Sequence, residues 1–169
     1  MMLDIAIDAD AEWDSSSRWE VLVREAAEAA IAESAFPQLT SSARPVELSV
    51  RLTSDSEMQA LNSTWRGKDQ PTNVLSFPQV DPGELGDITA DGPDLMLGDV
   101  VLAHGTCARE AEEKAIPFKD HAAHLVVHGT LHLLGYDHGG DDEAEAMERR
   151  EARALARIGI ADPYAQSRL

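Results

Sequence analysis

The segment Phe118–Leu134 constrains the fold more than any other part of the chain. Its apolar positions, which surround a helix on nearly every side, include Leu125, Val126, Val127, Leu131, Leu133 and Leu134. A helix that is apolar all round is buried and does not lie on the surface. The sequence therefore predicts a central buried helix. Side chains on such a helix are held firmly, as the ligands of a catalytic metal must be.

Two histidines of this helix have the spacing of metal ligands. His128 and His132 are four residues apart, so their imidazoles lie one turn apart on the same helix face. Gly135 follows, and glycine is the usual residue for ending a helix in a left-handed turn. The chain can then double back and bring His138 toward the other two. Three neutral histidines with an open fourth position form the ligand set of a catalytic zinc, so we predict one Zn²⁺ ion held by these three residues.

The remaining histidines are weaker candidates. His124 extends the spacing of four, but the rise from His124 to His132 is about 12 Å. Zinc–nitrogen bonds are only about 2 Å long, so one ion cannot use 124, 128 and 132 together. We expect His124 to support the ligands or the fold. His104 and His121 have no such spacing and are expected on the surface.

The histidine spacing is that of metzincin proteases, with one difference. In those enzymes a glutamate follows the first histidine and acts as general base. Here that position is Gly129, which can neither accept nor donate a proton through a side chain. Peptide hydrolysis is therefore disfavoured, although the ligand spacing keeps a metzincin-like metalloprotease as one alternative.

Further motifs accompany the histidines. The run His128–His138 reads His-Gly-Thr-Leu-His-Leu-Leu-Gly-Tyr-Asp-His, and Trp65-Arg66 and the block Pro71–Pro78 (Pro-Thr-Asn-Val-Leu-Ser-Phe-Pro) precede it. Leu97–Val100 (Leu-Gly-Asp-Val) and Gly159–Tyr164 (Gly-Ile-Ala-Asp-Pro-Tyr) complete the set. In this order, over residues 45–165, the chain resembles the YbeY family of endoribonucleases.

This resemblance implies a function. It implies a zinc-dependent endoribonuclease, specific for single strands, that acts in maturation of the 3′ end of 16S ribosomal RNA and in ribosome quality control. It also implies ribosomal RNA and the small ribosomal subunit, or its assembly factors, as partners. In the family an arginine at the position of Arg66 is associated with activity, and a guanidinium suits phosphate through its paired donors.

Neighbouring residues have more than one possible role. Asp137 either orients an imidazole or fixes the turn, and it joins Arg66 as a candidate catalytic residue. Lys68 is a second cation in the polar segment of Arg66. Because Gly129 cannot act as base, the metal supplies most of the activation, and either water or the 2′-hydroxyl of the RNA can attack. A third alternative is a non-catalytic ribosome-associated factor with a structural zinc.

Net charge works against RNA binding. The chain has 31 acids against 14 Lys and Arg, a net charge of −17, and long-range repulsion opposes contact with phosphate. The acids concentrate in Asp81–Asp94 and Asp141–Glu151. We interpret the excess as solubility and selectivity against casual nucleic-acid binding. DNA is not expected as a partner, and RNA binding is compatible either with the chain alone or with help from a partner protein.

The rest of the chain predicts an α+β fold, a small mixed sheet packed with helices around the central helix, because strands and helices do not alternate regularly. Strands are predicted at Leu3–Asp8, Val46–Leu52, Asn73–Phe77 and Leu95–Ala103. Helices are predicted from Ser17, from Ser54 through Leu61, at Gly105–Lys114 and at Asp141–Ile158. Loops are expected at Phe36–Pro45, Asn62–Gln70 and Gln79–Asp94.

Core positions follow from the same patterns. In the first helix Val21 and Leu22 should face the core. In the last helix Met147 and Leu155 should face the core, with the charged residues of that helix outward.

The length of 169 residues suits a single domain spanning 1–169. No apolar run approaches the ~20 residues of a membrane helix, no signal peptide is visible, and Cys107 is the lone cysteine. These features suggest a cytoplasmic protein without a membrane partner.

Overall fold

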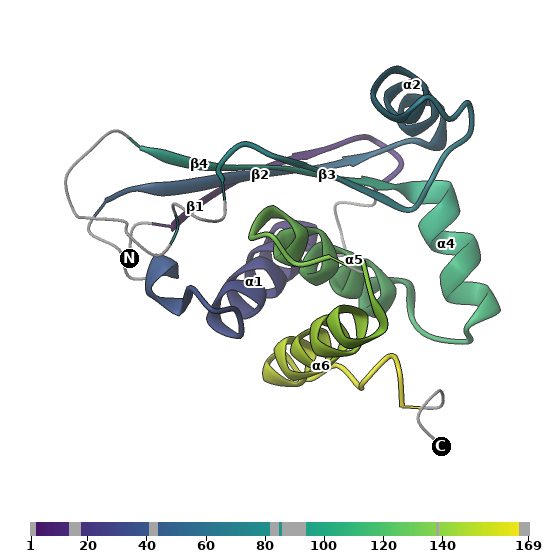
Figure 1. Cartoon of the computed structure of the whole chain (residues 1–169). Coiled ribbons are helices and arrows are strands. Elements are labelled where there is room, and N and C mark those ends of the chain that lie inside the picture. Colours follow the sequence, from purple (N-terminus) through teal and green to yellow (C-terminus); the bar gives the residue numbers. More distant parts are fainter. Residues whose placement is uncertain are drawn as a thin grey trace.

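The computed structural model describes residues 3–13, 18–40, 44–81, 85, 94–137 and 139–165 (Figure 1). Its centre is one mixed sheet of four strands: β1 (Leu3–Ala9), β2 (Val46–Thr53), β3 (Val74–Pro78) and β4 (Leu95–Ala103). The strand order is β1-β2-β4-β3. β1, β2 and β4 run parallel, whereas β3 pairs antiparallel with β4 at the edge. The predicted α+β class with a small mixed sheet is confirmed.

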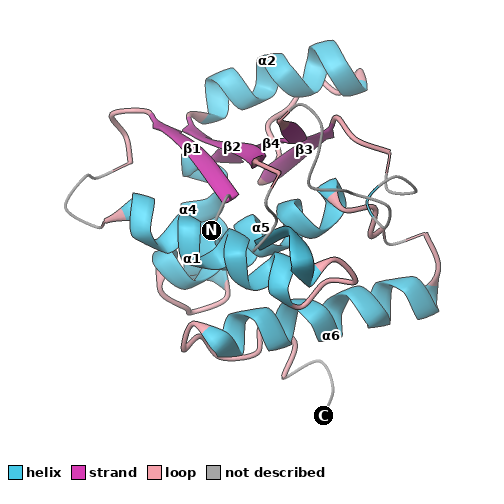
Figure 2. Cartoon of the chain, turned by 90° about the vertical axis from the view of Figure 1, so that its left-hand side faces the viewer, coloured by secondary structure: helices cyan, strands magenta, loops and turns pink. Residues whose placement is uncertain are grey.

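Helices cover the two faces of this sheet unequally. One face is covered by α1 (Trp19–Ala32) and α5 (Phe118–Leu133), with α4 (His104–Glu113) at one side, and α6 (Asp141–Arg157) packs on α1 and α5 farther from the sheet (Figures 1 and 2). Of the described helices, α2 (Asp55–Arg66) alone lies on the other face (Figures 1 and 2). The main core lies between the sheet and the helices of the first face, where α5 contacts α1, α4, α6, β3 and β4.

The helix α5 is central and buried, as predicted. Its end is also the predicted one: Gly135 has φ +100°. The Gly135 N–H donates to the carbonyl of His132 (3.0 Å), and the Tyr136 N–H donates to the carbonyl of Leu131 (3.1 Å). This pair of bonds is the Schellman motif, which satisfies the last carbonyls of a helix and reverses the chain.

The helix α2 is longer than predicted. Ser54 caps its first turn, since the Ser54 hydroxyl accepts a hydrogen bond from the Glu57 N–H (3.2 Å). The helix then continues to Arg66, although Asn62–Gln70 was expected to be a loop. The side chain of Asn62 is buried and donates to the Gln70 carbonyl (2.8 Å), so a polar residue lies on the buried side of the helix. Gly67, with φ +68°, ends it.

One core position predicted for α1 differs in the structure. Val21 is 53% exposed, so its predicted core position is wrong; Trp19, Val23 and Ala27 of α1 are buried in its place. Ser17, the predicted start of this helix, lies outside the described residues.

Most of the predicted loop Gln79–Asp94 also lies outside the described residues. A short 3₁₀ helix, Pro37–Thr40, occupies part of the predicted loop Phe36–Pro45. Among the residues described, no helix is long and apolar enough to span a bilayer.

Candidate functional site

The buried helix α5 opens to the surface at two side chains. From His121 to Leu134 every residue is buried except His128 and His132. Their Nε2 atoms lie 3.0 Å apart, so two ring nitrogens from adjacent turns converge on one point. Two nitrogens bound to one tetrahedral zinc at ~2.0–2.1 Å would be separated by ~3.3 Å. The observed separation is close to that value, so this pair fits a shared metal ion.

The structure thus brings together two of the three predicted ligands. His138, the third, lies outside the described residues. In the described part of the chain, no group of three or more His, Cys, Asp or Glu side chains is arranged to hold a metal ion. The pair and the reversal of the chain at Gly135 are therefore the features that support the predicted metal site.

A buried carboxylate lies behind the histidine pair. Glu151 of α6 is fully buried, and its Oε1 accepts a hydrogen bond from Nδ1 of His128. With its proton on Nδ1, His128 presents Nε2 as the lone-pair nitrogen, the form that a metal ligand requires. Burial opposes ionisation of Glu151, but hydrogen bonds from His124 and His128 outweigh it and lower its pKa to about 2. Glu151 is therefore a carboxylate at neutral pH.

The same carboxylate holds two further side chains. Its Oε2 accepts from the hydroxyl of Tyr164 and lies 3.3 Å from Nε2 of His124. His124 Nε2 is also 3.1 Å from the Tyr164 oxygen. Burial and the carboxylate raise the pKa of Tyr164, so the phenol keeps its proton. His124 therefore lies behind the histidine pair and contacts Glu151, which agrees with its expected supporting role.

The histidine pair faces a cavity of about 490 Å³, called here the histidine pocket. Arg66 and Asp137, the two candidate catalytic residues, both line it together with His128 and His132. Another wall is formed by Ser76 and Pro78 of the edge strand β3 and by Thr72 and Asn73, which precede this strand. Lys68 is exposed beyond Gly67 and is not among the described residues that line the pocket. Arg66, far from the histidines in sequence, is thus placed at their pocket by the last turn of α2.

Gly129 is explained by packing. A Cβ at this position would lie 2.6 Å from a methyl carbon of Val100 in β4 and 3.2 Å from the Ser76 hydroxyl. The Ser76 hydroxyl donates to the Gly129 carbonyl (3.1 Å), which ties β3 to α5. The side of α5 at residue 129 therefore faces the sheet and not the histidine pocket. A glutamate there could not act as the base of a metzincin, so the protease alternative loses its geometric basis.

Replacement of Gly129 by alanine is expected to destabilise the protein by about 1–3 kcal/mol, because the added methyl overpacks the contact between α5 and β4. The helix propensity of alanine, worth about 1 kcal/mol over glycine, acts in the opposite direction. Chemical denaturation of Gly129→Ala measures the balance. Gly140→Ala is the control, since a Cβ there meets no atom within 4 Å. Equal stability of Gly129→Ala and wild type would contradict this account of the packing.

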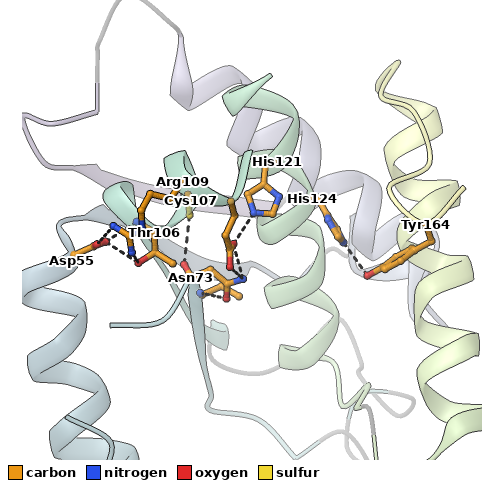
Figure 3. A network of polar contacts seen from close by, with 10 residues as sticks. Asp55, Asn73, Thr106, Cys107, Arg109, His121, His124 and Tyr164 are labelled. Atoms are coloured by element: carbon orange, nitrogen blue, oxygen red, sulfur yellow. Dashed lines mark hydrogen bonds and ion pairs between the residues drawn. The ribbon is translucent and has the colours of Figure 1, made fainter. Parts of the chain in front are cut away.

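A second polar network fixes the wall of the pocket (Figure 3). The Asn73 amide donates to Glu110 of α4 (3.0 Å), and the same carboxylate oxygen lies 2.8 Å from Nε2 of His121. His121 is thus buried, and the expectation that it lies on the surface is wrong. Burial lowers the pKa of His121 despite its contact with Glu110, so the ring is neutral at neutral pH. His104 is half-buried against Trp13 and Phe118.

Glu151 is the residue that the sequence reasoning missed. The charged residues of the last helix were expected to point outward, yet Glu151 is fully buried. A signal was available, because Glu151 lies four residues after Met147 and four before Leu155, the two residues expected to face the core. Both of them are buried.

Several known proteins are similar to this chain in sequence or in fold. The sequence model of the endoribonuclease YbeY family matches residues 6–159. Proteins named endoribonuclease YbeY are similar to the chain, from Rhizorhabdus wittichii (50% identical, covering 97% of this chain and 98% of the relative) and Novosphingobium aromaticivorans (51%, 95% and 95%). The solution structure of TM1509 from Thermotoga maritima has a similar fold, with a TM-score of 0.58 and 25% identity over 97% of this chain and 91% of that one. The chain therefore belongs to the endoribonuclease YbeY family.

Proposed function

We propose that this protein is a zinc-dependent endoribonuclease that cleaves single-stranded RNA in the maturation of the 3′ end of 16S ribosomal RNA and in ribosome quality control. One observation supports the metal dependence: the Nε2 atoms of His128 and His132 lie 3.0 Å apart. These two residues are also the only ones between positions 121 and 134 that are not buried. His138 completes the ligand set in this proposal. The whole chain, 1–169, acts as one catalytic domain.

A zinc ion in this site would activate the attacking oxygen and stabilise negative charge at phosphorus. The residues of the chain supply the remaining functions. Glu151 fixes the tautomer and ring orientation of His128 through the Nδ1 hydrogen bond. Arg66 lines the same pocket, where its guanidinium binds the scissile phosphate by paired hydrogen bonds and offsets the charge that develops there. Asp137, which also lines this pocket, orients a ligand or the attacking group.

The cellular setting belongs to the same proposal. The substrate is ribosomal RNA presented by the small ribosomal subunit or its assembly factors, in the cytoplasm. A substrate held by such an assembly reduces the disadvantage of a net charge of −17, because the RNA is then positioned by its own partners and not by long-range attraction to this chain.

Removal of the metal tests the proposal. The purified protein should contain zinc, and dialysis against a chelator should abolish cleavage of an unstructured oligoribonucleotide while the circular dichroism spectrum stays that of a folded protein. Added zinc should restore cleavage. The same oligonucleotide annealed to its complement, and a peptide substrate, are the controls and should stay intact.

Each alternative gives a different result in this experiment. Unfolding of the chelated protein would assign the zinc a structural role, and peptide cleavage would support a protease. Cleavage of RNA at an unchanged rate without any metal would contradict the proposal directly.

A further inference from the structure

The face of the sheet that carries α2 has a groove that the proposed cleavage does not use. It is a cavity of about 730 Å³, called here the outer groove, and its apolar lining includes Leu61 and Trp65 of α2, Phe77 of β3 and Val101 of β4. Trp65 is 68% exposed, the most exposed of the large apolar side chains described. Its ring lies edge-on to Phe77, with the ring centroids 6.2 Å apart. An exposed aromatic pair in an apolar groove is typical of a binding site.

The outer groove and the histidine pocket share two of their walls. In the last turn of α2, Trp65 lines the outer groove and its neighbour Arg66 lines the histidine pocket. In β3, Phe77 lines the outer groove, whereas Ser76 and Pro78 line the histidine pocket. Successive residues of a strand point to opposite faces. Among the described elements, β3 and the last turn of α2 thus form the boundary between the two cavities.

The charges of the outer groove select what can enter it. Asp8, Glu57 and Asp99 line it, and its one arginine, Arg51, is bound to Asp8 and Glu57, both at 2.5 Å. The groove is therefore negative and disfavours a phosphate. An uncharged planar group meets no such repulsion and can stack on the indole. A nucleobase attached to a phosphate that lies at Arg66 has this chemistry.

We propose that Trp65 is a stacking platform for an unpaired nucleobase of the RNA, next to the phosphate bound at Arg66. The RNA crosses the edge of β3, with its backbone in the histidine pocket and one base turned into the outer groove. Stacking on an aromatic ring is tolerant of base identity and requires a base that is free of its duplex partner. Trp65 thus gives the enzyme its preference for single strands. This inference rests on the proposed function for the identity of the substrate.

Binding without cleavage tests the platform. The probe is a nuclease-resistant single-stranded oligonucleotide, 2′-O-methylated with phosphorothioate linkages, titrated into the full-length zinc-loaded protein. Tryptophan emission should be quenched on binding. Trp13 and Trp19 are buried, so the change reports Trp65, and it should be absent in Trp65→Phe. The same probe annealed to its complement should give no quenching.

Affinity is measured on the same probe by fluorescence anisotropy. Trp65→Ala should weaken binding roughly tenfold or more, as expected for one lost base stack, and Trp65→Phe should restore most of the affinity. Val21→Ala, which removes another exposed apolar side chain from α1, should bind like wild type. Probes that each lack one base are then compared. Removal of the base that stacks on Trp65 should weaken binding to wild type, but the same probe should bind Trp65→Ala no more weakly than the intact probe does.

The outcomes separate this inference from the proposed function. Equal affinity of Trp65→Ala and wild type, or identical abasic profiles for both, would overturn the stacking platform whether or not the protein cleaves RNA. A failure of zinc-dependent cleavage would leave quenching and abasic coupling intact, because neither readout requires turnover. Unchanged RNA binding together with loss of binding to a protein partner in Trp65→Ala would assign the outer groove to that protein instead.

Discussion

A His132→Ala variant is expected to lose its zinc and all metal-dependent RNA cleavage while it keeps its fold. His132 is one of the two side chains of α5 between residues 121 and 134 that are not buried, so its truncation leaves no cavity in the core. Surface changes of this kind alter stability by about 0.5 kcal/mol or less. The remaining ligands cannot retain a tightly bound ion once one of the paired nitrogens is gone.

The measurement combines metal content by elemental analysis, an RNA cleavage assay and thermal unfolding of wild type and variant. Unfolding must be compared between metal-free proteins, because bound zinc stabilises the wild type by mass action. His104→Ala serves as the control, since His104 packs against Trp13 and Phe118 and does not line the histidine pocket. Zinc retained by His132→Ala would remove this residue from the ligand set. Zinc lost together with the fold would indicate a structural metal.

A Glu151→Ala variant is expected to lose about 3–5 kcal/mol of stability, because truncation of a buried charged partner leaves its neighbours without compensation. The three groups affected are Nδ1 of His128, the His124 ring and the hydroxyl of Tyr164. Glu151→Gln keeps the size of the side chain and one oxygen acceptor, so it should fold. Its zinc affinity should fall roughly 10- to 100-fold, the usual effect of losing a group that orients a metal-binding histidine.

Chemical denaturation of the metal-free proteins measures the first effect, and competition with a chromophoric chelator measures the second. Glu145→Gln is the matched control, since Glu145 lies on the exposed side of the same helix, where it pairs with Arg149 at the surface. Wild-type zinc affinity in Glu151→Gln would show that Glu151 packs the helices together but does not orient His128.

The features that the sequence predicts well are those with local causes. The end of α5 is determined by Gly135 and by two backbone hydrogen bonds within six residues, so the Schellman turn can be predicted from the local sequence. The strands β1 and β2 have alternating patterns, in which every second residue faces the covered side of the sheet. The Ser54 cap is equally local. For the site, the spacing of His128 and His132 on one helix predicted that their imidazoles would converge.

The features that it misses depend on contacts between distant segments. Glu151 is buried because α6 docks on α5, and a periodic pattern of charges does not reveal its three partners, His124, His128 and Tyr164, which lie on other segments. His121 is buried because Glu110 of α4 lies next to it. The length of α2 has a different explanation: Gly67 is a local stop signal for the helix, but the polar residue Asn62 is buried within it, so polarity does not mark where the helix ends.

The position of Tyr164 links the histidine site to the segment that follows α6. Glu151 lies 23 residues after His128, and Tyr164 lies 13 residues after Glu151. During synthesis the helix α5 therefore emerges well before the side chains that orient its histidines. A chain that ends before Glu151 has His128 and His132 without the carboxylate and the phenol behind them, so a metal ion at this pair would be held less firmly. In the proposed zinc site, firm binding of the ion therefore depends on Glu151 and Tyr164, which are both synthesised after α5.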